Sequence, residues 1–289
     1  MDNNVLNNFD IITPKITGPR PVVFLLIDSW GIGHNQPGSV FFDLKLKNFH
    51  PLVKKYPIAL LETDKETITQ RYQAMGASGL LTKTLAEAGL SQLNITESEK
   101  LVNSWFDFNG GRDSKLVNET LQVISSETGD RQNNPKQVSD IISNLALSAI
   151  KKSSADIIFV SLANLDLVTA TGNFKAAQEA ARALDKNIGK LVNAILKQNG
   201  LLIITAAYGR AESMINMGTE LPSLGISSNP VPFIIIGDEY EGKTIGLSDP
   251  LNGDLSLLAS AGTLYDITPT ILKILDLPLP ENLKGESLI

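Results

Sequence analysis

Four uninterrupted apolar runs recur along the chain, and they restrict the possible fold more than any other feature. They lie at 21–28 (PVVFLLID), 156–162 (DIIFVSL), 200–205 (GLLIIT) and 231–236 (VPFIII). A strand that is covered on both faces has no side chain facing water, so its sequence is apolar throughout rather than alternating. We therefore predict central parallel strands at all four positions.

A helical pattern separates two of these runs. Apolar residues recur at spacings of three and four between 174 and 195, namely Phe174, Ala177, Ala181, Leu184, Ile188, Leu191 and Ile195. Asn173 is a suitable N-cap for this helix, and Gly200 is suited to close it. A strand, a helix and a strand in close succession form a right-handed crossover between parallel neighbours. The predicted fold class is therefore α/β, a doubly wound, mostly parallel sheet with helices on both faces.

Polar and irregular segments indicate the domain boundaries. Residues 1–20 are rich in Asn and interrupted by Pro and Gly, so we interpret them as a polar N-terminal arm that precedes a single domain at 21–289. The segment 105–135 contains a Gly-Gly turn and is predicted to be a hairpin or an extended excursion. Thr268 and Pro269 predict the N-cap and first turn of a final helix.

Composition excludes several classes of protein. Hydrophobic residues make up 43% of the chain, which is enough for a large core, and the net charge of -6 opposes binding to nucleic acid. No cysteine is present, so disulfides, thiolate metal sites and cysteine nucleophiles are excluded. No segment approaches 18 consecutive apolar residues, and the N-terminus lacks a signal-peptide pattern. We expect a cytoplasmic protein without membrane insertion.

Two carboxylates follow predicted parallel strands. Asp28 ends the first apolar run, and Asp166 follows the second. The carboxyl ends of parallel strands meet at one edge of a sheet, which is where such folds bind ligands. Asp28 and Asp166 could together bind a divalent cation, or each could form an ordinary cap or salt bridge.

Ser78 and the two histidines are the other candidates for chemistry. Ser78 lies in the turn Met75-Gly76-Ala77-Ser78-Gly79 before a helical stretch, where free N–H groups favour an anion, so it could accept a phosphoryl group or simply cap the helix. His34 lies close enough in sequence to Asp28 to share a site, although a loop histidine is more often a surface group. His50 precedes Pro51 and is predicted to lie in a surface loop.

The same positions carry a resemblance to a known family. The chain resembles the cofactor-independent phosphoglycerate mutases of the alkaline phosphatase superfamily. The matching segments are LLIDSWG, MGAS, TLAEAGLSQLNITESEK, SWFDFNGGRD, FVSLANLDLVTATGNF with the long helix and LLIITAAYG after it, NPVPFIIIG and YDITPTILKILDLPLPENLKGESLI. These ordered segments extend over residues 21–289 and imply common ancestry.

The resemblance implies a two-metal centre that this chain has largely lost. Family members hold two divalent metals, usually manganese, and transfer phosphate through a serine. Asp28, Ser78 and Asp166 keep the family's residue types, so Ser78 is the remnant nucleophile position. Four other ligand positions are replaced, and they are Ala170, Ala207, Tyr208 and Ile226. Aliphatic side chains cannot coordinate a metal. We therefore expect no metal cofactor, or at most one weakly bound Mg²⁺ or Mn²⁺.

A second departure concerns substrate recognition. The family's large inserted transferase domain is missing between about 80 and 95, and its substrate-binding guanidinium groups are missing with it. Lys100, in the retained segment SEK, corresponds to a lysine near the family's substrate site. It is equally explained as a solvated charge at a strand edge.

These departures lead us to expect a non-catalytic pseudoenzyme that acts as a structural or protein-binding subunit. A protein partner or a homo-oligomer is expected. The first alternative is a metal-dependent phosphohydrolase or phosphotransferase that uses Asp28, Ser78 and Asp166, with His34 supplementing one weak cation. The second is a phosphate-ligand sensor that uses the helix end at Ser78 without turnover.

Overall fold

The computed structural model describes residues 18–34, 36–63, 66–126, 133–246 and 248–289, so most of the predicted arm at 1–20 lies outside the described residues. The described strands form one eight-stranded sheet in the order β4-β3-β5-β1-β6-β7-β2-β8. They are β1 (Val22–Leu26), β2 (Ile58–Glu62), β3 (Gln92–Glu97), β4 (Glu119–Ile124), β5 (Ile157–Ser161), β6 (Leu201–Thr205), β7 (Val231–Ile236) and β8 (Gly262–Thr263).

Most neighbours in this sheet are parallel, as predicted. The run β4-β3-β5-β1-β6 is parallel throughout, and the five central strands β1, β5, β6, β7 and β3 have only buried residues. The prediction for 231–236 is wrong in direction, because β7 runs antiparallel to both β6 and β2. The long irregular connection before β7 contains no crossover helix, and a crossover is what a parallel neighbour requires.

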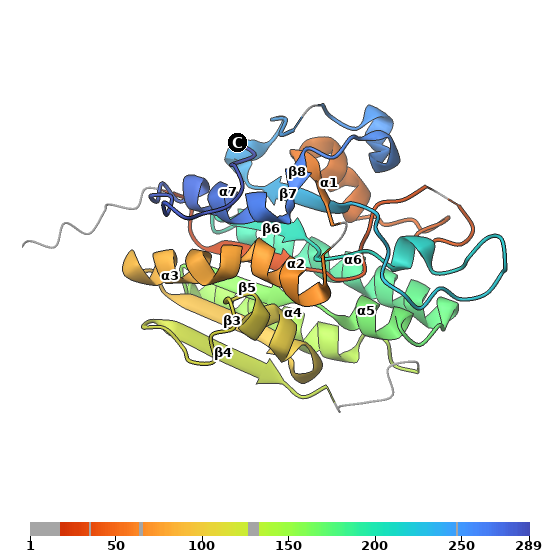
Figure 1. Ribbon diagram of the computed structural model, residues 1–289, viewed down its shortest axis with the longest axis horizontal. Coiled ribbons are helices and arrows are strands. Elements are labelled where there is room, and N and C mark those ends of the chain that lie inside the picture. Colours follow the sequence, from red (N-terminus) through yellow and green to blue (C-terminus); the bar gives the residue numbers. More distant parts are fainter. Residues whose placement is uncertain (1–17, 35, 64–65, 127–132, 247) are drawn as a thin grey trace, which may run out of the picture.

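Helices cover both faces of the sheet (Figure 1). One group packs around the longest helix, and it consists of α1 (Phe49–Lys55), α4 (Gln137–Lys152), α5 (Asn164–Thr169) and α6 (Phe174–Leu196). The other group consists of α2 (Ile68–Met75), α3 (Leu80–Glu87), α7 (Ile267–Ile274) and a π-helical segment (Val102–Asp107). The predicted doubly wound α/β class is therefore confirmed. None of the described helices is long and apolar enough to cross a bilayer.

One local prediction holds, and three are corrected. Asn173 caps α6, where its side chain accepts a hydrogen bond from the Ala176 N–H at 3.0 Å. The hairpin alternative for 105–135 is wrong, because its strand β4 pairs in parallel with β3; residues 127–132 lie outside the described residues. Thr268 lies inside α7 and donates to the Met75 carbonyl, so it is not the cap. His50 lies in α1 rather than in a loop.

The start of the domain is tied to the sheet by Asp156. This carboxylate accepts hydrogen bonds from the Ser91 N–H at 2.9 Å, the Ser91 hydroxyl at 2.6 Å and Arg20 at 3.1 Å. Partial burial acts to raise the pKa of Asp156, but the hydrogen bonds from Ser91 and the charge of Arg20 outweigh it and lower the pKa. The stabilisation is therefore present above the unfolded pKa of about 3.9 and is lost as pH falls through the lower folded value.

We expect Asp156→Asn to lower the free energy of unfolding by about 1 kcal/mol at pH 7, because the charged acceptor is lost at a partly exposed site. The difference from the native chain should shrink as the pH is lowered below about 4. Urea denaturation at both pH values measures it. Asp238→Asn, at an exposed position, serves as the control and should have little effect at either pH. A difference that grows on acidification would contradict the assignment.

Candidate functional site

The two predicted carboxylates meet at one edge of the sheet. Asp28 follows β1, and Asp166 lies in the first turn of α5, just after β5. Strands β1 and β5 are parallel neighbours, with Leu26 in register with Ser161, so their carboxyl ends emerge side by side. Both acids are buried. Parallel topology therefore brings together Asp28 and Asp166, although 138 positions separate them in the chain.

Lys100 joins these two carboxylates. It ends a short 3-10 turn after β3, and its side chain is only 6% exposed. The ammonium nitrogen lies 2.6 Å from Asp166 Oδ2 and 3.5 Å from Asp28 Oδ2. The interpretation of Lys100 as a solvated charge is therefore wrong. Its expected role near a substrate stays a prediction.

Asp166 accepts from four side chains. Lys100 and the Tyr208 hydroxyl contact Oδ2, the latter at 3.0 Å. Arg210 donates to Oδ1 at 2.8 Å and also to the Asp166 carbonyl at 3.0 Å, while the Ser29 hydroxyl donates to Oδ1 at 2.7 Å. Both oxygens of this carboxylate are therefore fully engaged by groups of the chain itself.

Asp28 is enclosed in a similar way. The hydroxyl of Tyr72, from the middle of α2, donates to Oδ2, and the Ala207 N–H donates to Oδ1 at 3.2 Å. Tyr72 is completely buried. We call Asp28, Asp166, Lys100 and Arg210, together with Tyr72 and Tyr208, the ion-pair cluster.

The cluster balances its own charge. Burial raises the pKa of Asp28, which also faces the charge of Asp166. For Asp166 burial acts in the same direction, but the charges of Lys100 and Arg210 prevail and lower the pKa. Burial acts to lower the pKa of Lys100, yet the two carboxylates raise it, so the ammonium form is retained. Burial also raises the pKa of both Tyr72 and Tyr208, which keeps their hydroxyls protonated as donors.

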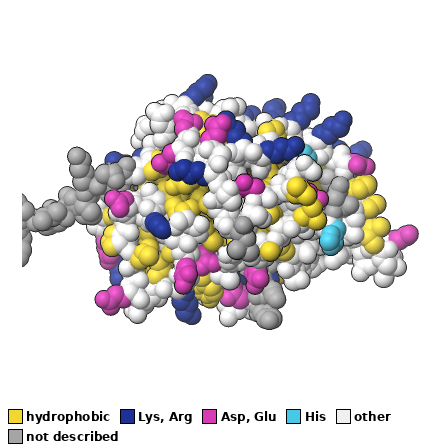
Figure 2. Space-filling model, turned by 90° about the horizontal axis from the view of Figure 1, so that it is seen from above, with side chains coloured by type: hydrophobic (Ala, Val, Ile, Leu, Met, Phe, Trp, Pro, Cys, Tyr) yellow, Lys and Arg dark blue, Asp and Glu magenta, His cyan; other side chains and the backbone are white. Residues whose placement is uncertain are grey.

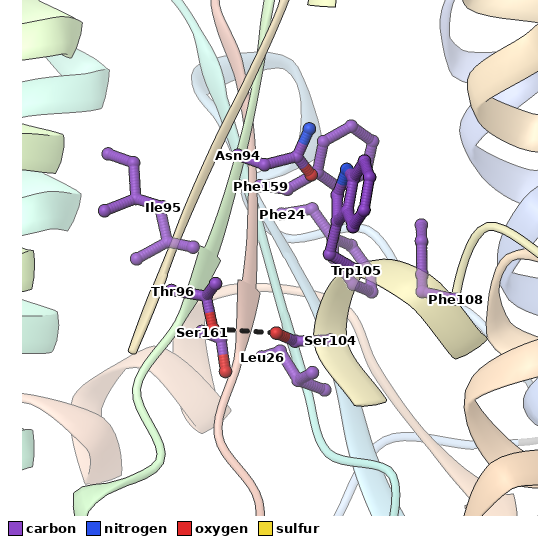
Figure 3. A pocket seen from close by; sticks show the side chains of 11 residues that line it. Phe24, Leu26, Asn94, Ile95, Thr96, Ser104, Trp105, Phe108, Phe159 and Ser161 are labelled. Carbon is purple, nitrogen blue, oxygen red and sulfur yellow. Dashed lines mark hydrogen bonds between the residues drawn. The ribbon is translucent and has the colours of Figure 1, made fainter. Parts of the chain in front are cut away.

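The segment that positions Lys100 is anchored to the sheet. The Ser104 hydroxyl donates to the Lys100 carbonyl at 2.8 Å and lies 2.7 Å from Thr96 Oγ1, the contact drawn as a dashed line in Figure 3. Phe108, just after the π-helical segment, packs against Phe24 of β1 and Phe159 of β5, with ring centroids 5.9 and 5.5 Å apart. This aromatic packing fixes the backbone from which the lysine reaches the carboxylates.

Ser78 lies in the turn between α2 and α3, whereas Tyr72, in the middle of α2, donates to Asp28. Ser78 is exposed and adopts a left-handed backbone conformation, with φ 55°. It does not cap the next helix, because the N-cap of α3 is Gly79 and no side chain satisfies it. The glycines around Ser78 instead allow two turns to pack closely: a Cβ on Gly79 would lie 2.5 Å from the Asn109 carbonyl oxygen.

The helix α2, which points Tyr72 into the cluster, was not predicted from the sequence. Thr67 and Gln70 form a reciprocal capping box that starts α2 at Ile68. The pattern T-x-x-Q was readable in the sequence as a helix start. Arg210 was also missed. It could have been found in the same way as the two acids, because it is a charged residue that follows a predicted buried strand, here the run at 200–205.

The two histidines lie elsewhere on the surface. His34 and His50 are both exposed, and histidine side chains are visible at the surface in Figure 2. They line a hollow of about 550 Å³ together with Trp30 and Glu212. Glu212 is buried and accepts hydrogen bonds from the Gly31 N–H, the Ser227 hydroxyl and Asn229. His34 therefore faces this hollow rather than supplementing Asp28 and Asp166.

The four replaced ligand positions have different surroundings. Ala207 and Tyr208 are buried beside the carboxylates, whereas Ile226 is half-buried and Ala170 is exposed at the end of α5. The Tyr208 hydroxyl lies between Lys100 and Asp166, accepting from the lysine and donating to the carboxylate.

Comparison with known proteins establishes the family. The model of the metalloenzyme superfamily matches residues 20–279. The chain belongs to this superfamily. Among curated proteins, it is 36% identical over 221 residues to the 2,3-bisphosphoglycerate-independent phosphoglycerate mutase of Rippkaea orientalis, which covers 75% of this chain and 40% of that protein. It is 33% identical over 235 residues to the enzyme of the same name from Acetivibrio thermocellus, with 80% of this chain and 43% of that protein covered.

Solved structures give the same relationship. A Leishmania mexicana phosphoglycerate mutase structure matches 71% of this chain and 38% of that chain, with 26% identity and a TM-score of 0.58. Alkaline phosphatase from the Antarctic bacterium TAB5 matches 92% of this chain and all of that chain at 14% identity, with a TM-score of 0.63, and this likeness concerns the fold. The chain thus matches about 40% of the length of these two phosphoglycerate mutases.

The donor set of this superfamily member does not fit a two-metal centre. A dication needs several carboxylate or imidazole ligands with free lone pairs. Here the only carboxylates in the cluster are Asp28 and Asp166, and the ammonium of Lys100 and guanidinium of Arg210 already contact them. Binding a dication at this place would require breaking these ion pairs or bringing the dication close to the ammonium of Lys100 and the guanidinium of Arg210.

Proposed function

We propose that this chain is a cytoplasmic, non-catalytic descendant of the phosphatase domain of phosphoglycerate mutase-like enzymes and serves as a structural or protein-binding subunit. In this proposal the ion-pair cluster replaces the metal-dependent centre. The fold is maintained by internal cations, and no tightly bound dication is required.

One observation carries the proposal: the ammonium of Lys100 contacts both remaining carboxylates, at 2.6 and 3.5 Å. A cation attached to the chain has an effective concentration that free metal cannot match. The contacts of Arg210 and Tyr208 then use the remaining acceptor capacity of Asp166. A serine nucleophile needs a metal or a base to activate it, and the two carboxylates that could hold a metal are already paired with Lys100 and Arg210.

The alternative, a hydrolase that uses Asp28, Ser78, Asp166 and His34, is less well supported. It requires these four groups to converge around a cation, but Tyr72 and Tyr208 already donate to the carboxylates, and His34 lines a hollow whose lining includes neither acid. The phosphate-sensor alternative requires an anion to bind at the helix end near Ser78, and no observation in the described residues supports such binding.

Metal titration and phosphate-ester turnover test the proposal together. We expect 1 mM Mn²⁺ to raise the melting temperature by less than about 1 °C, because a Kd above 10 mM contributes less than about 0.1 kcal/mol at that concentration. Hydrolysis of a generic aryl phosphate with added Mn²⁺ should equal that of Ser78→Ala. Inorganic phosphate at 1 mM should likewise leave the melting temperature unchanged. Stoichiometric Mn²⁺ in the purified protein, or turnover that is lost in Ser78→Ala, would overturn the proposal.

A further inference from the structure

The strand β4 forms one end of the sheet, and one of its sides has no described partner. It pairs with β3 alone, and Figure 1 shows it at the border of the sheet. The Gln92 N–H donates to the Asn118 carbonyl, so this residue faces β3. Backbone groups alternate in direction along a strand, and Thr120, Gln122 and Ile124 therefore also face β3. The N–H and C=O groups of Leu121 and Val123 face outward.

Beyond Glu119, this edge lacks the features that normally prevent pairing. Natural edge strands are protected by Lys, Pro, bulges or inward-pointing charges. From Thr120 to Ser126 the sequence TLQVISS has no charged residue and no Pro. The one acid of β4, Glu119, is buried and paired with Arg112 and Trp105. Val123 is 42% exposed, and nearby Val117 is 77% exposed. The outward edge is thus an uncharged, β-prone template.

We propose that β4 pairs antiparallel with β4 of a second copy of this chain across a two-fold axis at Gln122, which makes one continuous sheet through a dimer. With this axis, Leu121 and Val123 of one copy face Val123 and Leu121 of the other, and they exchange four backbone hydrogen bonds. A two-fold interface must be self-complementary. The resulting pairs are Leu–Val, Thr–Ile and Gln–Gln, and none of them places like charges opposite each other.

The inference does not rest on the loss of catalysis, because β4 lies at the sheet border and shares no residue with the ion-pair cluster. It names a second copy of the chain as the partner for this edge. A strand from a different protein would use the same backbone groups, and the measurement below separates the two, because only the first gives a dimer of the purified chain.

Charge placed on the two-fold axis tests the pairing. We expect the purified full chain to sediment at twice its mass of 31.2 kDa. Gln122→Lys and Gln122→Glu each bring two like charges together on the axis, so each variant should weaken the dimer at least about tenfold. An equimolar mixture of the two variants should recover the dimer, because Lys then faces Glu. Asn193→Lys, on an exposed position of α6, should leave the dimer unchanged.

The recovery by mixing excludes misfolding as the cause of dissociation, and equal urea midpoints of the monomeric variants would exclude it independently. A native chain that sediments as a monomer at 100 μM overturns the inference. A native dimer that both charged variants retain, or that the mixture does not restore, overturns it as well, because the interface would then lie elsewhere.

Discussion

Lys100→Met is expected to lower the free energy of unfolding by about 3 to 5 kcal/mol, the usual cost of removing one partner from a buried ion pair. Methionine keeps the length of the apolar side chain, but Asp28 loses its nearest cation and Asp166 keeps only Arg210. Two buried carboxylates then share one guanidinium. Urea denaturation at pH 7 measures the effect.

Neutralising one acid should recover part of this loss. In the double variant Asp28→Asn/Lys100→Met the single pair of Asp166 and Arg210 remains balanced, so we expect it to be more stable than Lys100→Met by about 1 to 2 kcal/mol. Lys83→Met is the matched control, because Lys83 is 64% exposed in a loose pair with Glu87 and should change stability by less than about 0.5 kcal/mol. A Lys100→Met variant within 1 kcal/mol of the native chain would show that the cluster does not depend on this ammonium.

Gly79→Ala is expected to destabilise the fold by about 3 kcal/mol or more through two separate effects. Gly79 has φ 87°, a conformation that costs an L-residue about 1 kcal/mol. A Cβ there would also lie 2.5 Å from the Asn109 carbonyl oxygen, which belongs to the packed turn after the π-helical segment. Backbone cannot give way as a flexible side chain can, so overpacking adds about 1 to 3 kcal/mol.

Gly89→Ala separates these two effects. Gly89 has a similar φ of 76°, but nothing lies within 4 Å of a Cβ at that position. We expect this variant to lose only about 1 kcal/mol, the conformational part alone. Thermal or urea unfolding of both variants gives the comparison. Equal losses in the two variants would mean that the close approach of the turns around Ser78 and Asn109 contributes nothing.

The close approach of these turns shows a structural role for the glycines around Ser78 that the sequence does not reveal. The segment Met75–Gly79 has the composition of a turn that presents a hydroxyl at a helix end, and glycine spacing alone does not tell whether the free space admits a ligand or another backbone. The capping box of Thr67 and Gln70 was the better local signal. It starts the helix from which Tyr72 contacts Asp28.

The α/β class, the buried strands, the long helix with its Asn173 cap and the meeting of Asp28 with Asp166 could all be predicted from the sequence. These features follow from local periodicity and from the rule that parallel strands end at a common edge. The direction of β7 was not readable from its own sequence, because a strand buried on both faces is apolar throughout in either direction.

Tertiary structure also decided what neutralises the two acids. Lys100 and Arg210 look like solvated charges in the sequence, since nothing local distinguishes a lysine on the surface from one that will be buried. Their burial results from the side-by-side placement of β3, β5, β1 and β6, which brings residues from four separate parts of the chain to one point. Electrostatic energy depends on distance and on exclusion of water, and the folded chain alone sets both quantities.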